Sequence, residues 1–274
     1  MPETISIITN TKNESQALPK FFERHTWVDE ILVMDSFSTD ATIEICKKYG
    51  HNFHQAELAG NSNIRNNLAL TLFKSDWVFF IDPDEFVSDE LKQQIQSFLL
   101  AADNKYAAYE FPRINFFMDR PLRHGGWSGN TVRIFRKNRV EFKGDAYHDH
   151  PIVKGQIGRL SGVIYHYPNP NIYWIIQKFN YISEFDAKEY YNKFGVLSKR
   201  KYKWLLLTKP LKNFWKGYIK KKGYLDGWHG FIYAALIWAF DVIRICKYAE
   251  KYITKNPNIL TPDKLADPWE SRKA

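Results

Sequence analysis

The stretch Phe79-Phe80-Ile81-Asp82-Pro83-Asp84-Glu85 decides the fold. Residues 76–81 have the aromatic and β-branched composition of a buried parallel strand, and Pro83 ends any strand ladder. The pattern therefore places Asp82 and Asp84 at the carboxyl end of a strand, where open α/β sheets bind ligands. Carboxylate oxygens in such a position suit Mg²⁺ or Mn²⁺. The structural alternative is an acidic turn that caps a helix starting a few residues later.

Strands and helices alternate through the first hundred residues. Predicted strands cover residues 4–11, 30–34, 52–55 and 76–81, and predicted helices cover 16–26, 42–49, 63–73 and 91–100. Such alternation is typical of βαβ units and a parallel sheet. Right-handed crossovers bring the loops after parallel strands to one edge of the sheet. Loops 10–14, 35–40 and 82–85 are therefore predicted to converge on one crevice.

The pattern changes near residue 105. Residues 106–167 resemble strands and loops, whereas 171–194 and 227–253 have helical patterns. We therefore expect an α/β domain over residues 1–170, divided at about residue 105, and a helical, basic and aromatic region over residues 171–274. The α/β domain should carry a mostly parallel, Rossmann-like sheet with helices on both faces.

Composition indicates a protein with a large hydrophobic core. The 274 residues are 45% hydrophobic and 16% aromatic. The two cysteines, Cys46 and Cys246, lie in separate apolar stretches and are interpreted as buried thiols in a reducing compartment. Residues 1–4 lack the character of a signal peptide, so we expect a cytoplasmic location. No Gly-x-Gly-x-x-Gly and no P-loop occurs, which disfavours dinucleotide redox and NTPase functions.

The positive charge is concentrated in one segment. Residues 199–222 hold ten Lys or Arg and no acid, so removing them from the net +9 leaves −1. Aromatic and leucine residues interleave with these charges, which suits a helix on an anionic membrane surface. Two alternatives stay open: a packed helix with a solvated basic face, and an RNA-binding platform, which would leave Asp82 and Asp84 unexplained.

The apolar run 231–240 is too short to predict a membrane span. It holds ten charge-free residues, and Asp241, Arg244 and Lys247 then follow on one stripe. A transmembrane helix needs about 20 apolar residues. The sequence therefore predicts peripheral attachment to a membrane and not a span.

Three segments together resemble glycosyltransferase family 2, whose fold is GT-A. They are Ile8-Thr9-Asn10-Thr11-Lys12-Asn13-Glu14, Ile31-Leu32-Val33-Met34-Asp35-Ser36-Phe37-Ser38-Thr39-Asp40 and Asp82-Pro83-Asp84-Glu85. Six later segments resemble the branch that builds the lipopolysaccharide inner core: 111–117, 123–127, 133–137, 147–150, 164–167 and 224–231. Two positions depart from the pattern: Asn10 replaces a frequent Pro, and Asp149 replaces a frequent Glu.

The resemblance implies a function. It implies a metal-dependent, inverting transfer from a nucleotide-diphosphate sugar to a lipid-linked saccharide such as lipopolysaccharide core. The cofactor would be Mn²⁺ or Mg²⁺, and the enzyme would lie on the inner face of the bacterial inner membrane. Residues 1–105 would bind the nucleotide sugar and residues 106–170 the acceptor. A sugar nucleotidyltransferase is the alternative enzyme, although the early glycine-rich phosphate loop of such enzymes is absent.

The resemblance also assigns roles around the metal. Asp84 would bind it directly, Asp82 would contact the donor ribose or the metal through water, and Glu85 would support both. His148 is preferred over His150 as a further ligand, since i, i+2 histidines on a strand point to opposite faces. Asp149 is the predicted general base, which takes the proton of the acceptor hydroxyl.

Further residues are assigned to the two substrates. The nucleotide-sugar set is Thr11, Asn13, Glu14, Asp35, Arg65, Asn66, Asp82, Arg133 and Arg136. The acceptor set is Trp127, stacking on a sugar, and His124. Structural alternatives exist for several: Asp35 can cap the next helix, Arg65 can be a surface arginine, and Trp127 can pack in a core.

Overall fold

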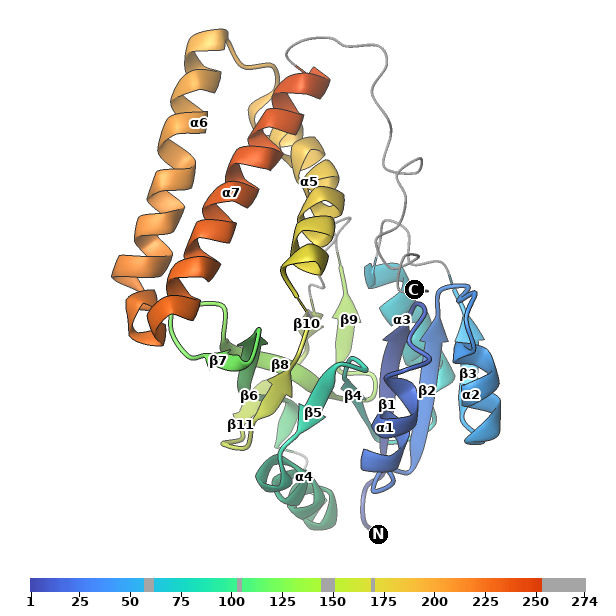
Figure 1. Cartoon of the computed structure of the whole chain (residues 1–274). Helices are drawn as coiled ribbons and strands as arrows, with labels where there is room; N and C mark the ends of the chain where they lie inside the picture. Colours follow the sequence, from blue (N-terminus) through green and yellow to red (C-terminus); the bar gives the residue numbers. More distant parts are fainter. Residues whose placement is uncertain (57–61, 103–104, 144–150, 169–170, 253–274) are drawn as a thin grey trace. The chain divides into compact units, whose positions relative to one another are not determined.

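The computed structural model describes residues 1–56, 62–102, 105–143, 151–168 and 171–252 (Figure 1). They divide into two compact units. The sheet unit comprises residues 1–114 and 129–166, and the helical unit comprises residues 115–128 and those from 167 onward. The hairpin at 115–128, expected in the α/β domain, thus groups with the later helices.

The sheet unit contains the predicted alternation and several shorter strands. Its first elements are β1 (Ile5–Thr11), α1 (Leu18–Arg24), β2 (Glu30–Asp35), α2 (Thr42–Lys48), β3 (Asn52–Gln55), α3 (Ser62–Leu72), β4 (Trp77–Phe80), β5 (Glu85–Val87) and α4 (Asp89–Ala101). Its later elements are β6 (Tyr106–Phe117), which continues into the helical unit, β8 (Gly129–Arg136), β9 (Val140–Phe142), β10 (Pro151–Val153), β11 (Gln156–Arg159) and β12 (Ile164–His166). Strands β5 and β9 to β11 were not predicted.

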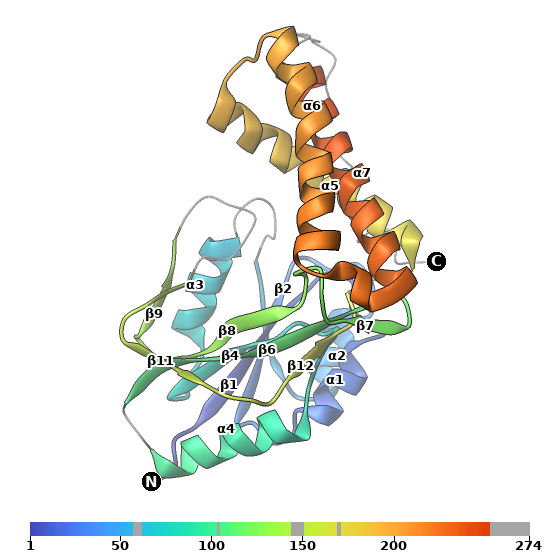
Figure 2. The same ribbon diagram turned by 90° about the vertical axis from the view of Figure 1, so that its left-hand side faces the viewer.

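The main sheet has the order β3-β2-β1-β4-β8-β6-β12-β5. The first four strands are parallel, and β4 pairs antiparallel with β8, which in turn pairs antiparallel with β6. Helix α3 lies on one side of this sheet and α4 on the other (Figure 2). The predicted α/β architecture with helices on both faces is confirmed. The parallel half puts the carboxyl ends of β1, β2 and β4 at one edge.

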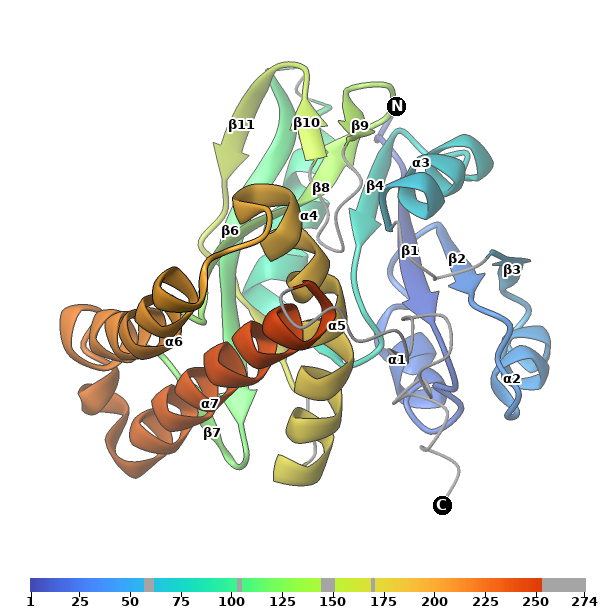
Figure 3. The same ribbon diagram turned by 90° about the horizontal axis from the view of Figure 1, so that it is seen from above.

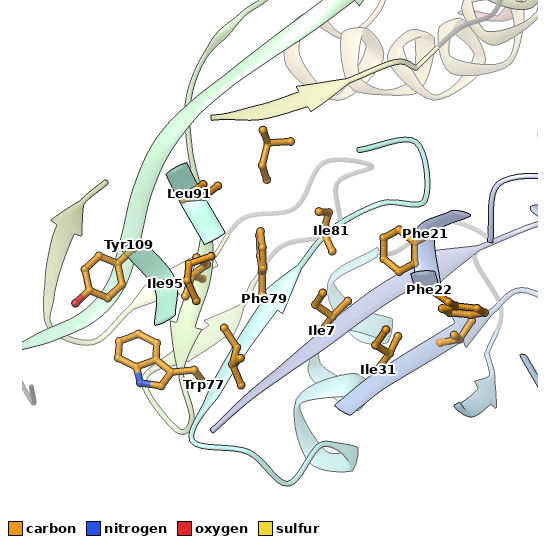
Figure 4. Packing of buried hydrophobic residues seen from close by; sticks show 14 of the residues in the cluster. Ile7, Phe21, Phe22, Ile31, Trp77, Phe79, Ile81, Leu91, Ile95 and Tyr109 are labelled. Carbon is orange, nitrogen blue, oxygen red and sulfur yellow. The ribbon is translucent and has the colours of Figure 1, made fainter. Parts of the chain in front are cut away.

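Alternate side chains of the central strands feed two hydrophobic cores. Ile7 of β1 and Phe79 of β4 pack with residues of α1 and α4, such as Phe21 and Ile95 (Figure 4). Their chain neighbours, among them Ile8, face the opposite core under α3. Because both faces are covered, β4 is apolar at every position and β1 is buried along nearly its whole length, without a solvent-facing polar side.

The helical unit is built on three long helices. They are α5 (Ile172–Phe194), α6 (Lys199–Phe214) and α7 (Gly227–Tyr252), and β7 (Arg120–Leu122), a π-helical turn η1 (Trp215–Lys220) and a 3₁₀ turn η2 (Gly223–Asp226) complete the unit. Helix α7 packs against both α5 and α6 and lies between them (Figure 3). Strand β7 pairs antiparallel with the last residues of β6.

The polar stripe of α7 faces inward. Asp241 is buried and accepts a hydrogen bond of 2.7 Å from Asn213 of α6. Arg244 pairs with Asp241 and, at 3.2 Å, with Asp186 of α5. Lys247 lies 2.7 Å from Glu184. The charges that interrupt the apolar run are therefore neutralised between helices, and the stripe is not a solvated face.

Large apolar side chains are exposed on the same helices. Along α6 and η1 they recur every three or four residues, at Trp204 (68% exposed), Leu207, Leu211, Trp215 and Ile219. That spacing places them on one face of the helix. Trp228 of α7 is also exposed.

Within the described part of the chain, one helix is long and apolar enough to cross a membrane by length and composition. It covers residues 223–252, and only 22% of its most apolar window is buried. Helix α7 packs along α6, which carries lysines from one end to the other. Burying α6 in hydrocarbon would desolvate those charges at high cost.

Candidate functional site

The turn after β4 is closed by a buried carboxylate. The backbone N–H of Asp82 donates to Glu85 Oε2 at 3.0 Å, and the backbone N–H of Glu85 donates to the carbonyl of Asp82 at 3.0 Å. Glu85 is fully buried and begins β5, whereas Asp82 and Asp84 keep partly exposed side chains. The cap of α4 is Ser88, whose Oγ accepts from the N–H of Leu91. The acidic turn therefore does not serve as the helix cap.

Two arginines from the antiparallel strands reach this turn. Arg113 of β6 places Nε 2.6 Å from Glu85 Oε1. Arg133 of β8 places Nη1 3.5 Å from Asp82 Oδ2 and 3.8 Å from Glu85 Oε2. Together with Asp84, the cluster holds three carboxylates against two guanidinium groups. It is therefore negative by one charge unless a cation or a protonated histidine is added.

A histidine from a distant part of the sequence completes the cluster. Nε2 of His166 lies 3.5 Å from Oδ2 of Asp84. Strand β12 pairs antiparallel with β5, with His166 opposite Glu85, and this pairing delivers the imidazole. A carboxylate beside an imidazole offers one hard and one borderline ligand, a combination that accepts Mn²⁺. Sequence reasoning missed His166 and Arg113, because only the pairing of β12 with β5 and of β6 with β8 brings them here.

The loops after β1 and β2 are joined by side-chain hydrogen bonds beside this turn. Asp35 is buried and accepts hydrogen bonds from Thr11 Oγ1 at 3.0 Å and from the N–H of Ser38 at 2.9 Å. Asn13 has a left-handed φ of 54°, and its Oδ1 accepts from the N–H of Thr39 at 2.9 Å. Three predicted residues, Thr11, Asn13 and Asp35, are thus brought together. Their recorded contacts hold the two loops in place.

A second carboxylate fixes the start of α1 to the loop before α2. Burial opposes the ionisation of Asp40, but hydrogen bonds from Ser15 and Thr42 outweigh it and hold the pKa of Asp40 below its ordinary value. Glu14 is tied to the same loop, because its N–H donates to Thr42 Oγ1 at 3.0 Å. The edge of the sheet is therefore a pre-shaped surface that needs little reorganisation to receive a ligand.

Two predicted residues lie under the sheet on α3. Arg65 and Asn66 are both buried. The side-chain amide of Asn66 has no hydrogen-bond partner among the described residues. A buried amide of this kind ordinarily finds a partner, so Asn66 is a candidate to bind a ligand.

The structure does not bring Arg136 to this edge. Arg136 pairs with Trp77, the first residue of β4, and its Nη1 lies 2.7 Å from Glu3 Oε1. Strand β8 runs antiparallel to β4, so three residues beyond Arg133 the chain has moved toward the amino ends of the parallel strands. The assignment of Arg136 to the nucleotide sugar is therefore corrected: it is a structural residue of the opposite edge.

Three expected residues lie outside the described ones: His148, Asp149 and His150. Among the described residues, no group of three or more His, Cys, Asp or Glu is close enough to hold a metal ion. Asp84 and His166 form a pair and not a complete ligand set.

The two predicted acceptor residues belong to the helical unit. Trp127 stacks on Tyr233 of α7 with ring centroids 4.6 Å apart, so one of its faces is used in packing. His124 Nδ1 lies 2.9 Å from Asp226 Oδ1. Both residues line a cavity of the helical unit.

The site geometry agrees with one family. Residues 6–164, more than half of the chain, match glycosyl transferase family 2. The chain belongs to this family. It is a glycosyltransferase, and the match spans β1 and β4 with the turn that carries Asp82 and Asp84. The two alternatives, a sugar nucleotidyltransferase and an RNA-binding protein, are set aside as the main activity.

Relatives and solved structures agree with this assignment. An uncharacterized glycosyltransferase of Rickettsia felis is 27% identical over 99% of this chain and 97% of its own length. Another, from Rickettsia prowazekii, is 27% identical over 94% of this chain and 91% of its own. A mannosyltransferase from Pyrobaculum calidifontis, solved with GDP-Man and Mn²⁺, matches 92% of this chain and 88% of its own with a TM-score of 0.53 at 12% identity. The last likeness concerns the fold, which supports the predicted GT-A architecture.

Proposed function

We propose that this glycosyltransferase moves a sugar from a nucleotide-diphosphate donor to a lipid-linked saccharide at a membrane surface, with inversion at the anomeric carbon. The observation that carries the donor half is the cluster of Asp82, Asp84 and His166 beside Arg133, at the carboxyl end of β4. The hydrogen-bonded loops after β1 and β2 lie along the same carboxyl edge of the parallel strands and would hold the nucleoside.

The cluster fits a divalent cation. Its net negative charge and its carboxylate–imidazole pair suit Mn²⁺, with Mg²⁺ as the harder alternative. Asp84 and His166 would hold the ion, and Asp82 would contact it through water or bind the ribose. When bound, the ion would neutralise charge that develops on the leaving diphosphate. The Pyrobaculum mannosyltransferase was solved with Mn²⁺ and GDP-Man, which supports the same pairing here.

Side chains of the protein would bind the diphosphate, position the cluster and take the proton of the acceptor hydroxyl. Arg133 lies at the mouth of the cluster, where its guanidinium can donate to the diphosphate. Glu85 would hold Asp82 and both arginines in position. Asp149 remains the proposed general base for the acceptor hydroxyl, and His148 a proposed further ligand.

The helical unit supports a lipid-linked acceptor. Its basic segment 199–222 carries an exposed apolar stripe from Trp204 to Ile219, and its internal charges are paired between helices. Lysines beside exposed tryptophans are the composition of a helix on an anionic membrane surface. We therefore propose peripheral attachment to the inner face of a bacterial inner membrane and a saccharide acceptor such as lipopolysaccharide core.

Loss of the Asp84 carboxylate tests the donor half. Release of nucleoside diphosphate from a panel of nucleotide sugars with Mn²⁺ would be measured for wild type, for Asp84→Asn, and for Asp89→Asn, which removes an exposed carboxylate from α4. We expect Asp84→Asn to lower turnover at least ~10²-fold, the usual scale for removing electrostatic stabilisation of a transition state, and Asp89→Asn to leave it unchanged. Equal turnover of all three proteins would refute the assignment.

A further inference from the structure

A cavity inside the helical unit has the chemistry of an anion site. It encloses about 250 Å³ and is lined by residues of the loop after β7, of η1 and of the first turns of α7. All of its lining residues belong to the helical unit. Leu122, Tyr233 and Ile237 give it apolar walls, Lys216 and Lys221 give it positive charge, and His124 adds an imidazole.

Two glycines in the loop after β7 allow Lys221 to pack closely against that loop. Gly125 and Gly126 have left-handed φ values of 73° and 84°, which residues with a Cβ rarely adopt. The N–H of Gly125 donates to the carbonyl of Lys221 at 2.9 Å. A Cβ on Gly126 would lie 2.3 Å from Nζ of Lys221, so the lysine side chain lies directly over this glycine. The loop and the Lys221 ammonium are thus fixed against each other.

The one acid of the lining does not neutralise these lysines. The carboxylate of Asp226 accepts from the N–H groups of Arg123 and His124, at 3.2 and 2.8 Å, and lies 2.9 Å from His124 Nδ1. Its oxygens are therefore engaged by the loop, and its contact with Nδ1 fixes the orientation of the imidazole. Within the described residues, neither Lys216 nor Lys221 forms an ion pair with a carboxylate. Two ammonium groups and an oriented imidazole thus share one cavity.

We propose that this cavity binds a phosphate group. Lysine ammonium groups are point-charge donors that bind phosphate without a fixed angle, and two of them with a histidine match an anion of more than one charge. The apolar walls suit the carbon skeleton that carries the phosphate. This inference rests on the proposed function, because a lipid-linked saccharide and the membrane around it both present phosphate. The source is either a phosphate of the acceptor or a phospholipid headgroup.

Calorimetric titration with glycerol 3-phosphate tests the cavity in the full-length protein. Lys216→Met and Lys221→Met remove one ammonium each and keep most of the length of the unbranched side chain. Lys220→Met and Lys222→Met are matched controls, since these neighbours do not line the cavity. We expect wild type and both controls to bind equally, and each cavity variant to bind at least about tenfold more weakly, the scale of one lost charge-assisted hydrogen bond. Absent binding to wild type, or equal loss in all four variants, would overturn the proposal.

Vesicles identify the source of the phosphate. Cosedimentation with phosphatidylcholine vesicles, with and without phosphatidic acid, would be compared for the same variants. All four variants remove one charge of the basic segment 199–222, so the comparison is between the cavity variants and the controls. A headgroup site predicts that the cavity variants lose more binding to phosphatidic acid than the controls do. An acceptor site predicts the same vesicle binding for all four variants, with the loss of glycerol 3-phosphate affinity confined to the cavity variants. Nucleotide binding with Mn²⁺, measured in parallel, separates this inference from the proposed function. Failure of nucleotide binding in wild type would remove the donor site and leave the phosphate result standing by itself.

Discussion

Glu85 is the residue whose charge the site geometry depends on most, so Glu85→Gln is a sharp test. The glutamine keeps the size of the side chain and an oxygen that can accept from the N–H of Asp82. It removes the negative charge that faces Arg113 at 2.6 Å and Arg133 at 3.8 Å. Both guanidinium groups then remain near a neutral amide in a poorly solvated site.

The size of the expected stability loss in Glu85→Gln follows from the burial of the Glu85 carboxylate. Removing one partner of a buried ion pair costs about 3–5 kcal/mol of unfolding free energy, because the other charge is left without compensation. Here the carboxylate is fully buried, but the arginine side chains are 21% and 22% exposed, so water relieves part of that cost. We therefore expect Glu85→Gln to lower the unfolding free energy by about 2–4 kcal/mol.

Urea unfolding at pH 7.5, followed by circular dichroism, measures this difference. Glu141→Gln is the matched control, because Glu141 pairs at 3.3 Å with Lys143 and both side chains are exposed. Such a surface pair contributes at most about 1 kcal/mol. A loss in Glu85→Gln no larger than that in Glu141→Gln would refute the view that a buried, charged Glu85 organises the turn.

Two further predictions concern stability and membrane binding. Burial lowers the pKa of His25 from 6.5 to about 4. The unfolding free energy that neutral His25 contributes is therefore complete above pH 6.5 and is lost as the pH falls toward 4, by at most about 3 kcal/mol. The urea midpoints at pH 7.5 and 4.5 should differ less in His25→Gln than in wild type, and an equal difference in both proteins would contradict this. The paired change Trp204→Glu and Leu207→Glu should strongly weaken sedimentation with anionic vesicles, whereas Leu100→Glu, at an exposed leucine of the sheet unit, should not; equal binding of all three proteins would place the membrane contact elsewhere.

The sequence predicted those parts of the fold that local patterns determine. Pro83 and the apolar run before it placed Asp82 and Asp84 at a strand end, and the alternation of strand and helix patterns located α2, α3 and α4 closely. Strands such as β5 and β7 were missed, because segments of three residues are stable only through pairing with distant neighbours.

Long-range pairing also explains the errors in the site. Arg133 and Arg136 look equivalent in sequence, but the antiparallel direction of β8 sends them to different ends of β4. His166 reaches Asp84 only through the pairing of β12 with β5. The stripe on α7, from Asp241 to Lys247, suggested a polar face, but its partners lie on α5 and α6. Local periodicity carries no information on such partners.

Nucleotide binding at the cluster of Asp84 and His166 is the central claim, and a thermal-shift panel tests it most directly. UDP, GDP, ADP and CMP would each be added to wild type and to Asp84→Asn, with and without Mn²⁺. A ligand that binds only the folded state raises the melting temperature once its concentration exceeds its dissociation constant. We predict stabilisation by one nucleoside diphosphate that requires Mn²⁺ and disappears in Asp84→Asn. No shift with any of the four, or an equal shift in the variant, would contradict a metal-dependent donor site at this edge of the sheet.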